Sequence, residues 1–168
     1  MIRDATEADA PSLCEIYNHY IAHSLATFET EPLASGEMAR RIAATTADFP
    51  WLLGESNERI VGYAYATRWK PRQAYQYTVE STVYLSPEAA GQGMGTRLMQ
   101  ALLERLAAQG VHAVLAGIAL PNDPSIALHE KLGFAKVAHF RQTGRKFDQW
   151  VDVGYWEKTL AEASEAAT

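Results

Sequence analysis

Alternating glycines occupy the segment 91–95, Gly-Gln-Gly-Met-Gly, directly before a run whose apolar spacing predicts a helix over Thr96–Gln109. The first N–H groups of a helix have no partner inside the helix, and they lie at the positive end of its dipole. The segment is therefore typical of a pyrophosphate site, although a glycine-rich turn without a ligand has the same pattern. It contains neither Gly-Lys-Ser/Thr nor the spacing G-x-G-x-x-G, so the two common nucleotide-binding loops are not matched.

A second candidate for chemistry is Glu80, which lies inside a predicted strand over Gln76–Leu85. Side chains in a strand alternate between two faces, and Glu80 shares the more polar face with Thr82 and Tyr84. Glutamate is disfavoured inside a strand. Two explanations stay open from the residues alone: general acid–base chemistry, or a charge that faces solvent or pairs with a lysine.

The elements that must position these residues follow from apolar periodicity and turn signals. We expect the order β, α, α, three strands, α, β, α, β, β. The middle of this order favours a parallel pair with a right-handed crossover, so the fold class is α/β with a mixed, partly parallel central sheet flanked by helices. The predicted helices are one that starts near Thr6 and continues through Ile21, then Glu37–Ala47, Thr96–Gln109 and Pro124–Leu132. The predicted strands that follow the first one are Trp51–Gly54, Arg59–Arg68, Gln76–Leu85, Val111–Ala119, Phe134–Arg141 and Phe147–Trp156.

Composition narrows the classes of protein. The 168 residues are 48% apolar and 21% charged, which is ordinary for a globular protein, and we expect one domain over residues 1–160 with a frayed tail at 161–168. The net charge of −5 argues against nucleic-acid binding. No apolar run is long enough to span a membrane, and the start Met1-Ile2-Arg3-Asp4 has no signal-peptide pattern, which predicts a cytoplasmic location. A single cysteine, Cys14, and scattered histidines predict no disulfide and no metal site.

Two motifs carry a resemblance to a known family. The segment 90–95, Ala-Gly-Gln-Gly-Met-Gly, resembles the loop Gln/Arg-x-x-Gly-x-Gly/Ala of the GCN5-related N-acetyltransferase (GNAT) superfamily, and it departs only in Ala90. Asn122, Ser125 and the segment 128–134, Leu-His-Glu-Lys-Leu-Gly-Phe, are similar to that superfamily's later signature. Segments 69–75, 78–84, 120–125 and 152–156 further resemble its phosphinothricin and methionine sulfoximine/sulfone branch, and the similarity extends from Ile2 to Lys158.

The resemblance implies acetyl-CoA as cosubstrate, no metal, and direct transfer of acetyl to the amino group of a small amino-acid analogue. It also implies that the strand before the glycine segment separates from its parallel neighbour, so that backbone N–H groups near its end contact the pantetheine arm and the thioester oxygen. The cofactor-binding residues that it implies are Val83, Tyr84, Leu85, Gly91, Gln92, Gly93, Met94, Gly95, Thr96 and Asn122.

The resemblance also assigns roles at the reacting end. Glu80 falls on the catalytic base, which takes a proton from the attacking amine, and His129 falls on the acid that protonates the departing thiolate; a helix-face histidine bonded to a neighbour is the alternative. The implied substrate-binding residues are Phe28, Lys70, Arg72, Tyr75 and Thr82. The alternatives are that Lys70 and Arg72 are solvated surface cations and that Phe28 and Tyr75 pack in the core. In the family that the sequence resembles, the loop that carries Lys70 and Arg72 lies near a dimer interface, which predicts a homodimer.

Three other functions stay open on the sequence. One is a GNAT enzyme that acetylates another small amine or a protein N-terminus. A second is an acyl-CoA-binding module without turnover, for which Ala90 is the hint and against which Glu80 argues. A third is a nucleotide-binding regulator, which would bind ATP or NAD instead of CoA.

Overall fold

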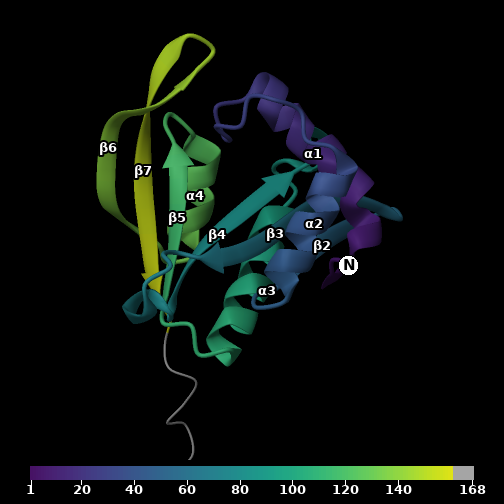
Figure 1. The fold of residues 1–168 in the computed structure, drawn as a ribbon, viewed down its shortest axis with the longest axis horizontal. Helices are drawn as coiled ribbons and strands as arrows, with labels where there is room; N and C mark the ends of the chain where they lie inside the picture. Colours follow the sequence, from purple (N-terminus) through teal and green to yellow (C-terminus); the bar gives the residue numbers. More distant parts are fainter. Residues whose placement is uncertain (161–168) are drawn as a thin grey trace, which may run out of the picture.

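A computed structural model describes residues 1–160 of the chain, and the expectation of a frayed tail falls on residues outside them (Figure 1). The described residues form a seven-stranded sheet of order β1-β2-β3-β4-β5-β7-β6. The strands are β1 (Ile2–Asp4), β2 (Trp51–Ser56), β3 (Arg59–Arg68), β4 (Thr78–Leu85), β5 (Ala113–Ala119), β6 (Ala135–Lys146) and β7 (Gln149–Thr159). The helices are α1 (Ala10–His23), α2 (Ser35–Thr46), α3 (Met94–Ala108) and α4 (Asp123–Lys131), with short 3-10 turns at Glu7–Asp9, Gln73–Tyr75 and Pro87–Ala89.

One parallel pair lies at the centre of the described sheet. Strands β4 and β5 are parallel, and the other neighbouring strands in residues 1–160 pair antiparallel. Helix α3 makes the crossover between β4 and β5, as the strand–helix–strand pattern of the sequence indicates. The expected fold class, a mixed and partly parallel sheet flanked by helices, is confirmed.

Helices cover both faces of the sheet. Helix α3 packs its apolar stripe, including Leu98 and Leu102, on one face, where Val79 of β4 and Val114 of β5 are also fully buried. Helices α1 and α2 cover the other face over β2 and β3, where Leu13, among others, is fully buried. Figure 1 shows these two helices on the opposite side of the strands from α3. No helix within residues 1–160 is long and apolar enough to cross a membrane.

The element boundaries differ from the predicted ones mainly at two places. Helix α3 begins at Met94 rather than at residue 96, because Gly93, with φ of 82°, takes the left-handed conformation that ends the preceding loop. The last two strands are longer than expected and form a hairpin that extends past the end of β5, since β6 continues to Lys146 and β7 to Thr159. The exposed sequence of this hairpin lacks a strict apolar alternation, so periodicity alone did not reveal its length.

Candidate active site

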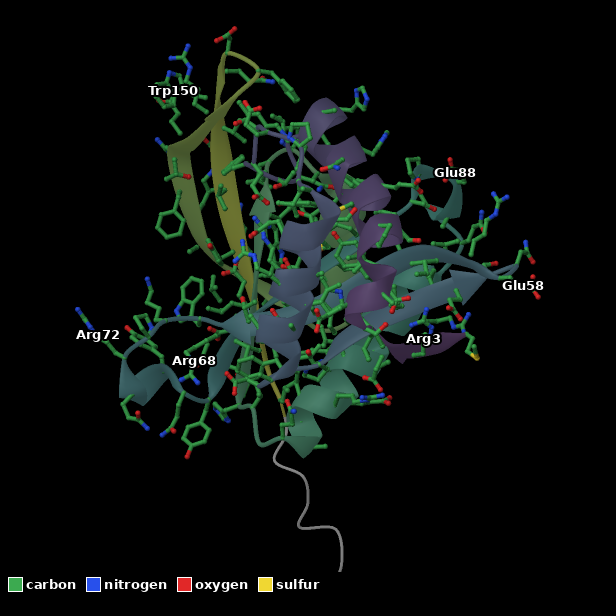
Figure 2. The ribbon with its side chains drawn as sticks, turned by 45° about the vertical axis from the view of Figure 1, so that its right-hand side comes forward. Arg3, Glu58, Arg68, Arg72, Glu88 and Trp150 are labelled. Atoms are coloured by element: carbon green, nitrogen blue, oxygen red, sulfur yellow. The ribbon has the colours of Figure 1, made fainter. Side chains whose placement is uncertain are left out.

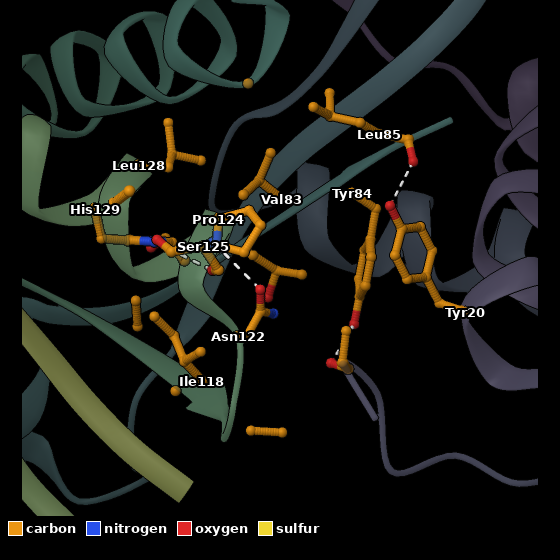
Figure 3. A pocket seen from close by; sticks show the side chains of 18 of the residues that line it. Tyr20, Val83, Tyr84, Leu85, Ile118, Asn122, Pro124, Ser125, Leu128 and His129 are labelled. Atoms are coloured by element: carbon orange, nitrogen blue, oxygen red, sulfur yellow. Dashed lines mark hydrogen bonds between the residues drawn. The ribbon is translucent and has the colours of Figure 1, made fainter. Parts of the chain in front are cut away.

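A cavity of about 680 Å³ opens between the ends of β4 and β5 (Figure 3). Four parts of the chain line it: the end of α1 with the loop that follows, β4 with the glycine segment, β5, and α4. The lining residues are 20, 26–28, 80–85, 90, 91, 93, 95, 96, 116–119, 122, 124, 125, 127–129 and 131. Most residues that the sequence analysis singled out therefore meet in one place.

The cavity exists because two parallel strands separate. Pairing between β4 and β5 runs from Thr78↔Ala113 to Glu80↔Leu115, and the remaining residues of both strands are not paired with each other. On the other side, β4 stays paired with β3 as far as Leu85. This separation is the feature that the resemblance implied for the strand before the glycine segment.

The hydrogen-bond register of β4 decides which backbone groups face the gap. Ser86 N donates to Val61 O at 2.8 Å, so every second residue back along β4 bonds to β3. Tyr84 is one of these, and we therefore correct its expected role: its backbone N–H faces β3, and only its side chain lines the cavity. The backbone of Val83 and of Leu85 faces the gap, and the carbonyl of Leu85 accepts a hydrogen bond of 2.7 Å from the Tyr20 hydroxyl (Figure 3).

The glycine segment is shaped to expose its backbone. Gly91 and Gly93 both have positive φ, 76° and 82°, and a Cβ on either would meet no atom within 4 Å. Their conformation, not crowding, therefore requires glycine. Gly93 precedes the first turn of α3, whose first N–H groups have no partner inside the helix, and Gly93, Gly95 and Thr96 line the cavity.

Two side chains of this segment do not line the cavity. Gln92 is exposed and donates its amide to the carbonyl of Glu88 at 2.7 Å. Met94 is 7% exposed, and its side chain packs against Gly54. A Cβ on Gly54 would lie 2.6 Å from the Met94 sulfur. The expected cofactor role of Gln92 and Met94 is thus restricted to their backbone, whereas Gly95 and Thr96 do line the cavity.

Glu80 lies on the floor of the cavity where the strands separate. Burial raises the pKa of its carboxyl, and a hydrogen bond from Tyr155 together with the charge of Lys70 counteracts that rise. A carboxylate whose pKa is raised is a stronger base than an exposed one. Thr82, on the same face two residues further, also lines the cavity.

His129 is 3% exposed and packs edge-on against Phe134 at a centroid distance of 5.1 Å. Its Nδ1 lies 2.7 Å from the carbonyl oxygen of Ser125, and because a carbonyl only accepts, Nδ1 carries the proton. Burial lowers the pKa of the ring, so it is neutral at neutral pH and its Nε2 is an acceptor. As an acid toward a thiolate, His129 would first have to gain a proton.

Asn122 is the N-cap of α4, and its side-chain oxygen accepts from Ser125 N at 3.2 Å. Asn122 can cap the helix and also contact the cofactor. Only its side-chain oxygen is used in the cap, so the amide nitrogen remains a donor on a residue that lines the cavity (Figure 3).

The loop after α1 forms the wall opposite α4. Tyr84 donates its hydroxyl to the carbonyl of Ala26 at 3.3 Å, and the Tyr17 hydroxyl lies 2.8 Å from that of Thr27. Phe28, expected as a pocket wall, lines the cavity beside them and is 40% exposed.

Lys146 fastens this wall to the β6–β7 hairpin. It is 3% exposed, and its ammonium donates to three carbonyls at the end of α1 and in the loop, those of Tyr20 (3.2 Å), Ser24 (2.5 Å) and Thr27 (2.9 Å). Gly144, two residues earlier, makes room for the Phe28 ring, which a Cβ would approach to 2.4 Å. The hairpin therefore positions the cavity wall, although it is far away in sequence.

We expect Lys146→Met to lower the free energy of unfolding by about 2–3 kcal/mol. Each of the three hydrogen bonds from the ammonium is worth about 1.5–3 kcal/mol, but removing a buried charge also removes its desolvation cost, and methionine keeps the length of the chain. Urea denaturation measures this loss. Lys136→Met, at an exposed position of the same strand, should change the midpoint little. A Lys146→Met variant as stable as the parent would show that the three contacts do not hold the wall.

Three expected substrate residues lie outside the cavity. Lys70, Arg72 and Tyr75 are exposed on the loop between β3 and β4, and none of them lines the cavity. Figure 2 shows Arg72 at the outer end of this loop, directed away from the sheet. Lys70 differs from the other two, because its charge acts on Glu80 and its ammonium lies 5.1 Å from the centroid of the Trp69 ring.

Sequence reasoning missed Tyr20, Tyr155 and Gly117. Tyr20 fitted the apolar stripe of α1, and Tyr155 lay in a matched segment without a role. Gly117 is an isolated glycine inside a predicted strand, and such a glycine often marks a close approach of other groups. This pattern in the sequence could have indicated Gly117 as a site residue. Among the residues described, no cluster of His, Cys, Asp and Glu has the arrangement of a metal site.

Comparisons with known proteins agree with this geometry. The sequence family described as "Acetyltransferase (GNAT) domain" matches residues 2–154. The chain is 44% identical over 157 residues to a phosphinothricin N-acetyltransferase of Streptomyces viridochromogenes, which covers 94% of this chain and 86% of that protein. It is 35% identical over 162 residues to an L-methionine sulfoximine/L-methionine sulfone acetyltransferase of Salmonella typhimurium. That match covers 96% of this chain and 95% of the Salmonella protein.

A solved structure with a ligand is also similar. It is a GNAT superfamily phosphinothricin acetyltransferase from Sinorhizobium meliloti in complex with AcCoA, at a TM-score of 0.93 and 35% identity, covering 100% of this chain and 91% of that one. The chain belongs to the GNAT acetyltransferase family and is an acetyl-CoA-dependent N-acetyltransferase.

Proposed function

We propose that the protein transfers acetyl from acetyl-CoA to the α-amino group of a small amino-acid analogue of the phosphinothricin or methionine sulfoximine/sulfone type. The observation that carries the proposal is the separation of β4 and β5, which places Glu80 at the floor of a cavity whose mouth is the glycine segment. The names of the similar proteins support this substrate class.

The proposed mechanism is direct transfer in a ternary complex. The pyrophosphate binds at the start of α3, and the pantetheine arm lies between the separated strands beside the backbone of Val83 and Leu85. Asn122 donates to the arm from the opposite side. Because those strand N–H groups face the gap, one of them also stabilises the negative charge that develops on the thioester oxygen.

At the reacting end, Glu80 takes the proton that an ammonium must lose before its nitrogen can attack. The nitrogen forms a bond to the thioester carbon, the carbon–sulfur bond breaks, and CoA leaves as a thiolate. The acylated nitrogen gives its second proton to solvent and becomes a neutral amide. His129 is a neutral hydrogen-bond acceptor in this site, and we propose that it orients the thiol end of CoA. It can protonate the thiolate only after its ring has gained a proton from solvent.

The proposal also concerns the acceptor's anionic end and the assembly. Lys70 is the cation whose charge reaches Glu80, so we assign the acceptor carboxylate to Lys70. Because the family resemblance puts this loop near a dimer interface, and because Arg72 and Tyr75 are exposed, we propose a homodimer in which the loop serves the neighbouring site. Residues 1–160 act as one acetyltransferase domain in a cytoplasmic protein, and the family match over residues 2–154 supports that extent.

An acceptor panel tests the substrate class. Thiol release from acetyl-CoA, with the product identified by mass, is measured for phosphinothricin, methionine sulfone, proteinogenic amino acids, simple primary amines and a peptide N-terminus. The proposal requires the amino-acid analogues to have the highest kcat/KM. A preference for the peptide or for an amine without a carboxylate would contradict it, and CoA binding without turnover on any acceptor would favour a binding module.

The role of Lys70 has its own test. Lys70→Met should raise the KM of a carboxylate-bearing acceptor about tenfold, since losing one ion pair of ~1.4 kcal/mol changes binding by that factor. The KM of acetyl-CoA should stay unchanged, and a primary amine without a carboxylate should be indifferent to the substitution. Arg40→Met, on the exposed side of α2, is the matched control. Equal losses with both acceptors would contradict a contact between Lys70 and the carboxylate.

A further inference from the structure

We propose that Tyr155 is a positioning residue for Glu80, and that Gly117 is glycine because the two side chains meet above it. The inference rests on the proposed role of Glu80 as the base. It assigns the hydroxyl of Tyr155 to one oxygen of the carboxylate, so that the other oxygen is presented to the amine.

The register of three strands brings these residues together. Gly117 of β5 pairs directly with Tyr155 of β7 in the antiparallel ladder. On its other side β5 runs parallel to β4, with Leu115 opposite Glu80. Since side chains two residues apart share a face, Glu80, Gly117 and Tyr155 lie on the same face of the sheet.

Distances from Gly117 show that the two side chains flank the same point above this residue. A Cβ on this residue would lie 3.1 Å from Oε1 of Glu80, 3.1 Å from the hydroxyl oxygen of Tyr155 and 3.0 Å from Cζ of Tyr155. Any side chain larger than hydrogen would therefore occupy the space in which the carboxylate and the hydroxyl meet. Gly117 is also exposed, so core packing does not explain the glycine.

The Tyr155 ring is held on two sides. Trp69 packs edge-on against it at a centroid distance of 5.4 Å, and Phe140 of β6 does the same at 5.8 Å. These contacts limit the ring to one orientation and direct its hydroxyl toward Glu80. The hydroxyl is a neutral donor, because burial and the neighbouring carboxylate raise the pKa of Tyr155.

Three titratable side chains act on or respond to Glu80 from the elements around it. Tyr155 comes from β7, Lys70 from the loop after β3, and Tyr65 from β3, where burial raises the tyrosine's pKa and the charge of Glu80 adds to that rise. Burial raises the pKa of Glu80, and the Tyr155 hydrogen bond and the Lys70 charge lower it. If the Tyr155 hydroxyl is removed, only the Lys70 charge counteracts the effect of burial. The pKa of Glu80 should then rise further, so the carboxyl would titrate at higher pH.

The decisive variant is Tyr155→Phe, which removes the hydroxyl and keeps the ring between Trp69 and Phe140. We expect the acidic limb of the kcat/KM profile to move upward by about one pKa unit, the size of one hydrogen bond to a charged group. Activity should fall about tenfold on that limb and much less at high pH. The ratio of parent to variant at each pH cancels the acceptor's own titration.

Two further variants sharpen the result. Gly117→Ala keeps the hydroxyl but forces the pair apart, so it should move the limb in the same direction. Tyr77→Phe, at a tyrosine that is 58% exposed just before β4, should reproduce the parent profile. Acetyl-CoA affinity, measured by calorimetry, should be the same in all three variants and confirms that they are folded.

The outcomes separate the positioning role from the base itself. If Tyr155→Phe loses activity equally at every pH, the ring or hydroxyl is only structural and the inference fails. If its profile matches the parent while Glu80→Gln is inactive, the positioning role is wrong and the base stands. If Glu80→Gln retains full activity, the base assignment fails and the inference fails with it.

Discussion

Glu80→Gln is expected to lower kcat by about 10²–10⁴, the usual contribution of a positioned general base. Glutamine keeps the shape of the side chain and can still meet the Tyr155 hydroxyl, but it cannot accept the ammonium proton. Because the glycine segment is remote from this position, acetyl-CoA affinity should barely move. Turnover with saturating acceptor at pH 7–8, together with calorimetric titration of acetyl-CoA, measures both quantities.

The pH dependence of the parent follows from the same residue. Burial raises the pKa of Glu80, so the fraction of ionised carboxylate, and with it kcat/KM, falls as the pH drops through a value above the ordinary range of glutamate. In Glu80→Gln this acidic limb should disappear. Glu104→Gln, at an exposed position of α3, is the matched control. Turnover of Glu80→Gln within a few-fold of the parent would exclude this carboxylate as the base.

The second large effect is expected at the glycine segment, where Gly93→Asp should weaken acetyl-CoA binding more than a hundredfold. The aspartate would place a negative charge beside the pyrophosphate, and two like charges about 4 Å apart near a protein surface repel by about 4 kcal/mol. No atom lies within 4 Å of a Cβ at this position, so the substitution causes no steric clash in the folded protein. Calorimetry or thermal shift with CoA measures the loss.

The chain offers a close control for the backbone strain of that substitution. Gly110, after the other end of α3, has φ of 81°, against 82° for Gly93, and a Cβ on it also meets nothing within 4 Å. Gly110→Asp therefore carries the same conformational cost without a charge near the cofactor. Acetyl-CoA affinity should be unchanged in Gly110→Asp, and equal losses in the two variants would assign the effect to stability instead of to the pyrophosphate.

Local patterns in the sequence predicted most of the architecture. The stripe that includes Leu98 and Leu102 predicted α3, and the apolar run of β5 predicted a buried strand beside β4. Both depend on spacing within one element, which the chain specifies without reference to distant residues. The glycine segment belongs to the same class, because a positive φ at Gly93 and the free N–H groups after it are local properties.

The alternation of β4 also predicted the face of Glu80 correctly, but the positions of other site residues depend on distant parts of the chain. Lys70, Arg72 and Tyr75 are close to Glu80 in sequence, yet the loop that carries them is directed outward, and only the charge of Lys70 acts on the carboxyl. A loop's direction depends on its packing, which no residue spacing encodes. The same holds for Tyr84, because the pairing of β4 with β3 turns its backbone N–H away from the gap.

The sequence by itself thus determined the element order, the glycine segment at the start of α3 and the strand that carries the carboxylate, since each is set by neighbours within a few residues. The tertiary structure decided the environment of that carboxylate. Gly117 and Tyr155 meet Glu80 because three strands share a register, and Lys146 holds the cavity wall from a position 119 residues after Thr27. Such contacts arise from long-range pairing and burial, which act between segments that have no common pattern in the sequence.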